Sequence, residues 1–335
     1  MQRHAWLFLV SGLVCLASSA VRAHHSSSAF NREEVIAFEG TVTRLDWTHP
    51  HVYLVIEDMD GIEWLIETGA LPVMMRSGWT RDSFAPGDAV IVRANPDRDR
   101  SENHGLLLSI AHPGGDQFAS MTLTLRRAVL DSDASTSDLA GVWHGDPALT
   151  AVFMSALASH PLTEQGSAAQ AQYQESMDPT AECIPWPSPF VVAANGLYLS
   201  EVELNDNTIV FRNEFYNTER VVYTDGREHP ENAERTIQGH SIGWWENETL
   251  VVDTRFFADH RSPVPITGIP SGEQKHVVER YTLSDDGKEV FIEIFLEDPE
   301  YLAEPITANL TWKYSPHLEM LGAECELEIA RRYIQ

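Results

Sequence analysis

Lysine and cysteine are scarce in this 335-residue chain, and acidic residues greatly outnumber basic ones. Three of the 23 basic residues are lysines, so 20 are arginines, and the 50 acidic residues give a formal net charge of −27. A chain this acidic repels phosphate backbones, so we do not expect a nucleic-acid partner. The charge bears on partners and does not select a fold.

Long apolar runs are absent after the first 23 residues. Residues 1–23 have a basic start, an apolar run over 6–17 and the tripeptide Val-Arg-Ala at 21–23. This order is typical of a cleavable export signal peptide, and the run is too short to span a bilayer as a stable helix. We therefore expect an exported protein with no membrane span after signal cleavage.

The three cysteines become two after signal cleavage, because Cys15 lies within the signal. Cys183 and Cys325 remain, and two cysteines in an oxidising compartment favour a disulfide bond. The bond would tie the proline-rich segment 183–189 to a C-terminal strand. A metal-binding cysteine pair is the weaker alternative, since neither residue has a second cysteine nearby.

The region 24–120 reads as a small β-domain. Alternating and β-branched segments, bounded by turn residues, predict five strands and one short helix between the third and fourth of them. This order suits a five-stranded barrel of the OB type. OB barrels often bind oligonucleotides, but the region lacks a basic face with interleaved aromatics. The strands are expected at 35–47, 52–57, 62–68, 89–94 and 106–111, with the helix at 71–78.

A small polar linker at 121–138 precedes a larger region, 139–335, which is also rich in strand signals. Short turns between the strands predict a mainly antiparallel barrel or sandwich, so the whole chain is expected to be all-β. Gly-Val-Trp at 141–143 is similar to the opening of lipocalin-type barrels. After this first segment, strands are expected at 197–204, 208–215, 220–224, 237–245, 250–257, 276–283, 290–296, 306–314 and 324–333.

Several motifs together resemble a family of uncharacterised secreted bacterial proteins. They are His-His-Ser at 24–26, Trp-Thr-His-Pro-His at 47–51, Gly-His-Ser-Ile-Gly at 239–243 and Leu-Val-Val-Asp-Thr at 250–254. One departure is His49, where the resemblance leads us to expect asparagine. The resemblance implies a periplasmic or secreted protein in bacteria, with a small β-domain before a β-rich region, and it implies no activity.

The expected mature N-terminus is a candidate metal site. Cleavage after Ala23 would make His24 the first residue, and its free amine and imidazole can chelate one ion. His25, His49 and His51 are further candidate ligands, since side chains two apart on an extended segment share a face. An amine with two imidazoles suits Cu(II), which prefers tetragonal nitrogen ligands. The alternative is a flexible tail with solvated histidines and strand-end histidines that bond locally.

A second candidate site surrounds the predicted hairpin at 239–257. His240, Asp253 and His276 are candidates for acid–base catalysis inside the second barrel. His276 and Arg280 are expected on one strand face, with Glu279 on the other. Trp244 and Trp245 alternate, so one is expected in the core and the other along a cavity. The candidate ligand-binding residues are Trp244, Trp245, Asp225, Arg227 and Arg280, with His229 nearby. The alternative is turn chemistry and structural hydrogen bonds.

The sequence thus favours an exported periplasmic binding protein with a small-molecule or metal ligand, the metal being copper at the mature N-terminus. One alternative is an enzyme that acts by acid–base chemistry on a small, mostly apolar substrate in the cavity of the second barrel. The other is a non-catalytic structural or interaction protein of the cell envelope.

Overall fold

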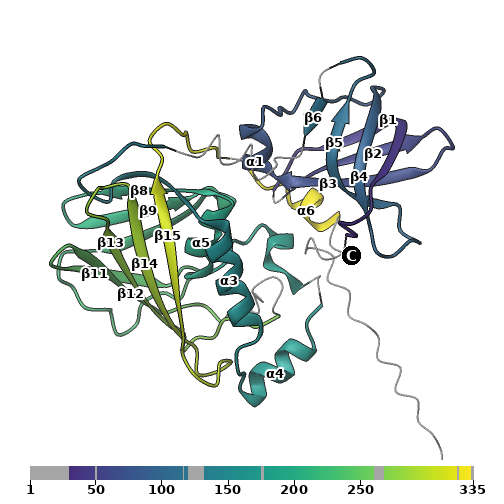
Figure 1. Cartoon of the computed structure of the whole chain (residues 1–335). Helices are drawn as coiled ribbons and strands as arrows, with labels where there is room; N and C mark the ends of the chain where they lie inside the picture. The colour runs from purple at the N-terminus through teal and green to yellow at the C-terminus, as the bar shows by residue number, and fades with distance from the viewer. Residues whose placement is uncertain are drawn as a thin grey trace, which may run out of the picture.

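The computed structural model describes residues 30–49, 51–115, 117–119, 132–174, 177–259, 268–322 and 324–332. Two β-barrels lie side by side in this part of the chain (Figure 1). The all-β, mainly antiparallel prediction is confirmed. The expected signal peptide, His24, His25 and most of the expected linker lie outside the described residues.

The first barrel has the predicted OB-like topology. Its sheet runs in the order β3-β2-β1-β4-β5-β6, and a parallel pairing of β3 with β5 closes it. The short helix α1 follows β3, as the sequence predicts. The elements are β1 Ile36–Asp46, β2 His51–Asp58, β3 Glu63–Ala70, α1 Leu71–Arg76, β4 Ala89–Pro96, β5 His104–Ala111 and β6 Gln117–Ala119.

Alternation along the strands fills this barrel. Val90, Val92 and Ala94 on β4 are at most 1 % exposed, because every second side chain of a strand points to the same face. Gly40 on β1 marks a close approach between strands. A Cβ there would lie 2.5 Å from the Glu57 carbonyl oxygen on β2, so a larger residue would push these strands apart.

The second region is a closed barrel, not a sandwich. Its strand order is β10-β11-β12-β13-β14-β15-β7-β8-β9, so neighbours in sequence are neighbours in space and β15 pairs with β7 to close the ring. Lipocalins share such an up-and-down order, but with eight strands. All pairs are antiparallel except β10 with β11. The strands are β7 Gly141–Gly145, β8 Leu199–Leu204, β9 Thr208–Asn213, β10 Thr218–Tyr223, β11 His240–Glu246, β12 Thr249–Arg255, β13 His276–Leu283, β14 Glu289–Glu297 and β15 Ile306–Tyr314.

Three helices between β7 and β8 were not anticipated: α3 Pro147–Ala158, α4 Glu164–Ala171 and α5 Phe190–Ala193. Capping residues start the first two, since the side chains of Asp146 and Thr163 accept backbone N–H groups of the first turn. The apolar residues of α3 are distributed around the whole helix. Val152 therefore faces solvent and is 65 % exposed, while Phe153 is buried. Without a single apolar stripe, the helical period is hard to see in the sequence.

The expected strand at 324–333 is wrong, because Leu327–Arg332 forms the helix α6. This helix lies beside the first barrel, far from the strands with which it is nearly contiguous in sequence (Figure 1). Cys183 and Cys325 are joined as predicted, with their sulfur atoms 2.04 Å apart. The bond therefore holds a helix, not a C-terminal strand, to the proline-rich segment. No helix of the described ranges is long and apolar enough to cross a membrane.

A buried ion pair joins the two barrels. Arg76, in the last turn of α1, binds the carboxylate of Glu214, and the two side chains are 8 % and 1 % exposed. Glu214 also accepts the backbone N–H groups of Leu199 (2.8 Å) and Leu321 (2.7 Å). Burial raises the pKa of Glu214, and Arg76 opposes that rise. One carboxylate thus connects the first barrel, the second barrel and the C-terminal segment.

We predict that Arg76→Ala lowers the free energy of unfolding by about 3–5 kcal/mol, because it leaves the Glu214 charge buried without its partner. The midpoint of urea unfolding measures this change. Arg81→Ala is the matched control, since the Arg81–Glu326 pair is 3.8 Å long and exposed. We expect a change within about 1 kcal/mol there. Equal midpoints for the two variants would show that the buried pair does not hold the barrels together.

Candidate functional site

A row of acids and histidines follows the seam between β3 and β5 of the first barrel. Glu67 on β3 lies between His51 and His104, with one carboxylate oxygen 2.5 Å from His51 Nδ1 and the other 3.6 Å from His104 Nε2. His104 Nδ1 is in turn 3.5 Å from Asp97. The parallel register, in which Leu65 is opposite His104 and Glu67 is opposite Leu106, brings this row together.

Charge and burial set the protonation of this row. Burial opposes ionisation of Glu67, but His51 and His104 together outweigh it and lower the pKa of the carboxyl to about 2. An ionised carboxylate only accepts hydrogen bonds, so His51 donates from Nδ1, and the tautomer with its one proton there has a lone pair on Nε2. The His51 side chain is 27 % exposed. A carboxylate behind one ring nitrogen is the arrangement that orients histidines for metal binding through the other nitrogen.

His49 does not share this arrangement. The strand β2 begins at His51, so His49 lies before the strand. His49 is fully buried, and its ring stacks on Tyr216 of the second barrel at 5.2 Å. Burial, and then the neighbouring His51, lower the pKa of His49 to about 4. His49 is therefore part of the contact between the barrels.

The three proposed acid–base residues of the second barrel do come together, on its outer wall. Asp253 on β12 accepts from His276 Nε2 at 2.7 Å. Its other oxygen accepts from His229 Nε2 at 2.9 Å. His229 Nδ1 is 2.9 Å from His240 Nδ1. Burial opposes ionisation of Asp253, but the hydrogen bonds from His276 and His229 outweigh it and lower its pKa to about 2.

Strand alternation explains why these residues face outward. Their neighbours Ser241, Thr254 and Val277 are at most 1 % exposed and point into the barrel, where Ser241 and Thr254 bond each other at 2.9 Å. Ser241 is therefore no partner for His240 as a nucleophile. Glu279 and His276 lie on opposite faces of β13, as the sequence predicts, but Glu279 faces inward and His276 outward, so His276 is not inside the barrel as expected.

The expected ligand cavity inside the second barrel is not where the sequence places it. Trp244 and Trp245 are 42 % and 47 % exposed near the turn between β11 and β12, so neither is in the core. Two small cavities at the interior of the second barrel measure about 20 Å³, beside Arg220, and about 10 Å³, beside Lys275. Each has room for about one water molecule.

A buried polar group occupies part of this interior. Arg220 pairs with Glu279 at 2.6 Å, with side chains 3 % and 0 % exposed. The Tyr281 hydroxyl donates to the same carboxylate at 3.1 Å. Large apolar side chains, including Phe211 and Trp312, pack around the group. These contacts make the barrel interior a packed core.

The remaining predicted ligand-binding residues form local pairs. Arg227 pairs with Asp225 at 2.6 Å and lies over the Tyr223 ring at 4.1 Å. Arg280 pairs with Glu246 at 2.8 Å. Asp225 and Arg227 lie beside the outer-wall histidines, since Tyr223 stacks on His240 at 5.3 Å. Arg280 on β13 lies opposite Val251, which in turn lies opposite Trp244. Arg280 and the two tryptophans are therefore near the turn between β11 and β12, away from the histidines.

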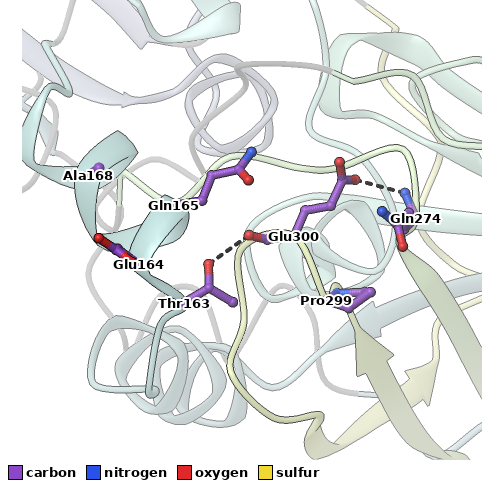
Figure 2. A pocket seen from close by; sticks show the side chains of 7 residues that line it. All are labelled: Thr163, Glu164, Gln165, Ala168, Gln274, Pro299 and Glu300. Atoms are coloured by element: carbon purple, nitrogen blue, oxygen red, sulfur yellow. Dashed lines mark hydrogen bonds between the residues drawn. The ribbon is translucent and has the colours of Figure 1, made fainter.

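A surface pocket of about 620 Å³ lies between α4 and the loop after β14 (Figure 2). Two of its polar groups bond within the protein: the Thr163 hydroxyl donates to the Glu300 carbonyl, and the Glu300 carboxylate accepts from the Gln274 backbone N–H. It contains none of the predicted site residues. The lining is Thr163, Glu164, Gln165, Ala168, Gln274, Pro299 and Glu300. Among the described residues, no group of three or more His, Cys, Asp or Glu side chains is arranged to hold a metal ion.

We predict that Asp253→Asn lowers the free energy of unfolding by about 2 kcal/mol at pH 7, from a fall of the aspartate pKa by roughly two units on folding. A depressed pKa stabilises the fold above the unfolded value of 3.8 and loses this contribution as the pH falls toward 2. Urea unfolding at pH 7 and at pH 3 measures both effects. Asp285→Asn, in an exposed turn, is the control. A difference from wild type that grows on acidification would contradict the assignment.

No curated protein matches the chain. A structure of the S. pombe Stn1–Ten1 complex is 20 % identical, with a TM-score of 0.21, over 24 % of this chain and 57 % of that one. The chain therefore spans little more than half of that structure. A mutant of the fluorescent protein UnaG is 9 % identical, with a TM-score of 0.27, over 52 % of this chain and 95 % of that one. Residues 4–107, which include the first four strands, match a family of unknown function, DUF6152.

Proposed function

We propose that this protein is an exported periplasmic binding protein that binds Cu(II) at its mature N-terminus. The ligands are the amine and imidazole of His24 and the Nε2 atom of His51. Three nitrogens of this kind suit the tetragonal preference of Cu(II). Export is supported by the signal-like sequence of residues 1–23 and by the Cys183–Cys325 bond, which suits an oxidising compartment.

The observation that carries the proposal is the place where the N-terminal chain joins the first barrel. Phe30 is 1 % exposed, packs edge-on against His104 at 4.8 Å and pairs with Asp97. His104 belongs to the row that contains His51. Six residues span at most about 20 Å. Covalent geometry therefore allows His24 to reach this row.

Glu67 is proposed as the residue that orients the copper ligand. Its carboxylate is 6 % exposed and contacts His51 at 2.5 Å. His104, on the other side of the same carboxylate, is the alternative source of the second imidazole. His25 is a further candidate. His49 is left out, because it is buried against Tyr216.

The first experiment is a Cu(II) titration of protein that begins at His24, beside protein with one extra residue before His24. The extension moves the free amine away from the imidazole of His24 and removes the chelate. We expect tight one-to-one binding that the extension abolishes, measured by calorimetry and by the electron paramagnetic resonance spectrum of Cu(II). Equal weak binding by both forms would refute the proposal.

We further predict that His51→Ala weakens Cu(II) binding more than Glu67→Gln, which should cost about 10–100-fold in Kd as an outer-shell change. His317→Gln, an exposed histidine of the second barrel, is the control and should bind as wild type does. If His104→Gln weakens binding and His51→Ala does not, the second imidazole is His104. Unchanged binding in both variants would restrict the site to the N-terminal residue.

A further inference from the structure

The outer wall of the second barrel carries a second chemical site, built from Asp253, His229 and His240. We propose that His240 Nε2 is a general base that activates water against a small carboxylic ester, and that His229 and Asp253 form the proton relay behind it. The proposal is independent of copper and shares no residue with the N-terminal site.

When each imidazole carries one proton, the hydrogen-bond chain determines where that proton lies. Ionised Asp253 only accepts, so His229 donates to it from Nε2 at 2.9 Å. A neutral imidazole has one N–H, so Nδ1 of His229 must accept. Its partner 2.9 Å away is Nδ1 of His240, which therefore donates. The chain ends in a lone pair on Nε2 of His240.

The surroundings keep this base neutral and hold its ring. Burial, then His229 and Arg227, lower the pKa of His240, so that the ring remains unprotonated near neutral pH. Tyr223 stacks on the ring at 5.3 Å with an interplanar angle of 22°. The guanidinium of Arg227 lies 4.1 Å from the Tyr223 ring centre. The base is thus positioned from β10, from the connection between β10 and β11, and from β12.

Other charged groups border the cluster. Arg255 contacts Asp253 at 3.1 Å and His276 at 3.3 Å, and its side chain is 52 % exposed. Glu297 is 3.9 Å from His276 Nδ1. His276 donates to the second oxygen of Asp253 and so positions that carboxylate. The exposed donors of Arg255 are suited to an oxyanion that develops beside the cluster.

An ester is the substrate class that this donor set supports. The cluster holds a base and cationic donors but no serine, because Ser241 points into the barrel. Phe256 lies 5.9 Å from the His229 ring and Phe295 lies 6.3 Å from the His276 ring, so an apolar acyl group has neighbours here.

The proposed step balances without a redox partner. His240 Nε2 takes a proton from water as the water oxygen bonds to the ester carbonyl carbon. Asp253 stabilises the resulting imidazolium through His229. The bond from that carbon to the leaving oxygen then breaks, and this oxygen takes the proton from Nε2. The products are a carboxylic acid and an alcohol.

The test is hydrolysis of p-nitrophenyl acetate in the presence of EDTA, which excludes adventitious metal. We expect His240→Gln to lower kcat/KM by about 100-fold, in the range for a lost general base. We expect a loss for Asp253→Asn and His229→Gln as well, with His317→Gln unchanged as the matched histidine control. The rate should rise with pH and level off below the ordinary histidine pKa of 6.5. Hydrolysis by His240→Gln at the wild-type rate would overturn the proposal.

A second measurement avoids variants that fail to fold. Diethyl pyrocarbonate acylates unprotonated imidazole nitrogen, and peptide mass spectrometry locates the label. In the wild-type protein at pH 6, His240 should be labelled faster than His317. Slower labelling of His240 would exclude an available lone pair and overturn the proposal. Because neither assay needs copper or the N-terminal residues, failure here leaves the copper proposal untouched.

Discussion

Closure of the two barrels is the constraint on which the candidate sites depend. Backbone N–H and C=O groups at an open sheet edge need partners, and closure supplies them. Each barrel contains one parallel pairing, β3 with β5 and β10 with β11. Both candidate sites lie at these parallel pairs.

The reason is geometric. Parallel neighbours cannot be joined by a tight hairpin and require a longer connection. In the second barrel this connection is residues 224–239, and it carries Asp225, Arg227 and His229 across the outer wall to His240. In the first barrel the chain passes through α1 and β4 before β5 returns to β3, which brings His104 to Glu67. Polar groups distant in sequence meet at both places.

The contact between the barrels does not depend on a parallel strand pair, as the candidate sites do, but on a buried carboxylate, a disulfide bond and ring stacking. Glu214 is buried and connects three segments, and the cysteine bond holds the C-terminal helix to the proline-rich segment. The ring of His49 stacks on Tyr216 at the same contact. The two histidines in the Trp-Thr-His-Pro-His motif therefore have different roles. One packs between the barrels, and the other, His51, is oriented by a carboxylate at the surface.

The sequence by itself determined the strands of both barrels, the OB-like order, the cysteine pairing and the opposite faces of His276 and Glu279, because alternation and turn residues are local signals. It also named His240, Asp253 and His276 together, since their strands are consecutive. Only the tertiary structure decided that these three face outward, because the pattern of one strand does not say which face meets the core. Glu67, His104 and Asp97 carried no such signal, since the β3–β5 pairing joins strands that are not neighbours in sequence. Leu327–Arg332 forms a helix that contacts residues 179–182 beside the cysteine bond, and local propensity cannot anticipate contacts so distant in sequence.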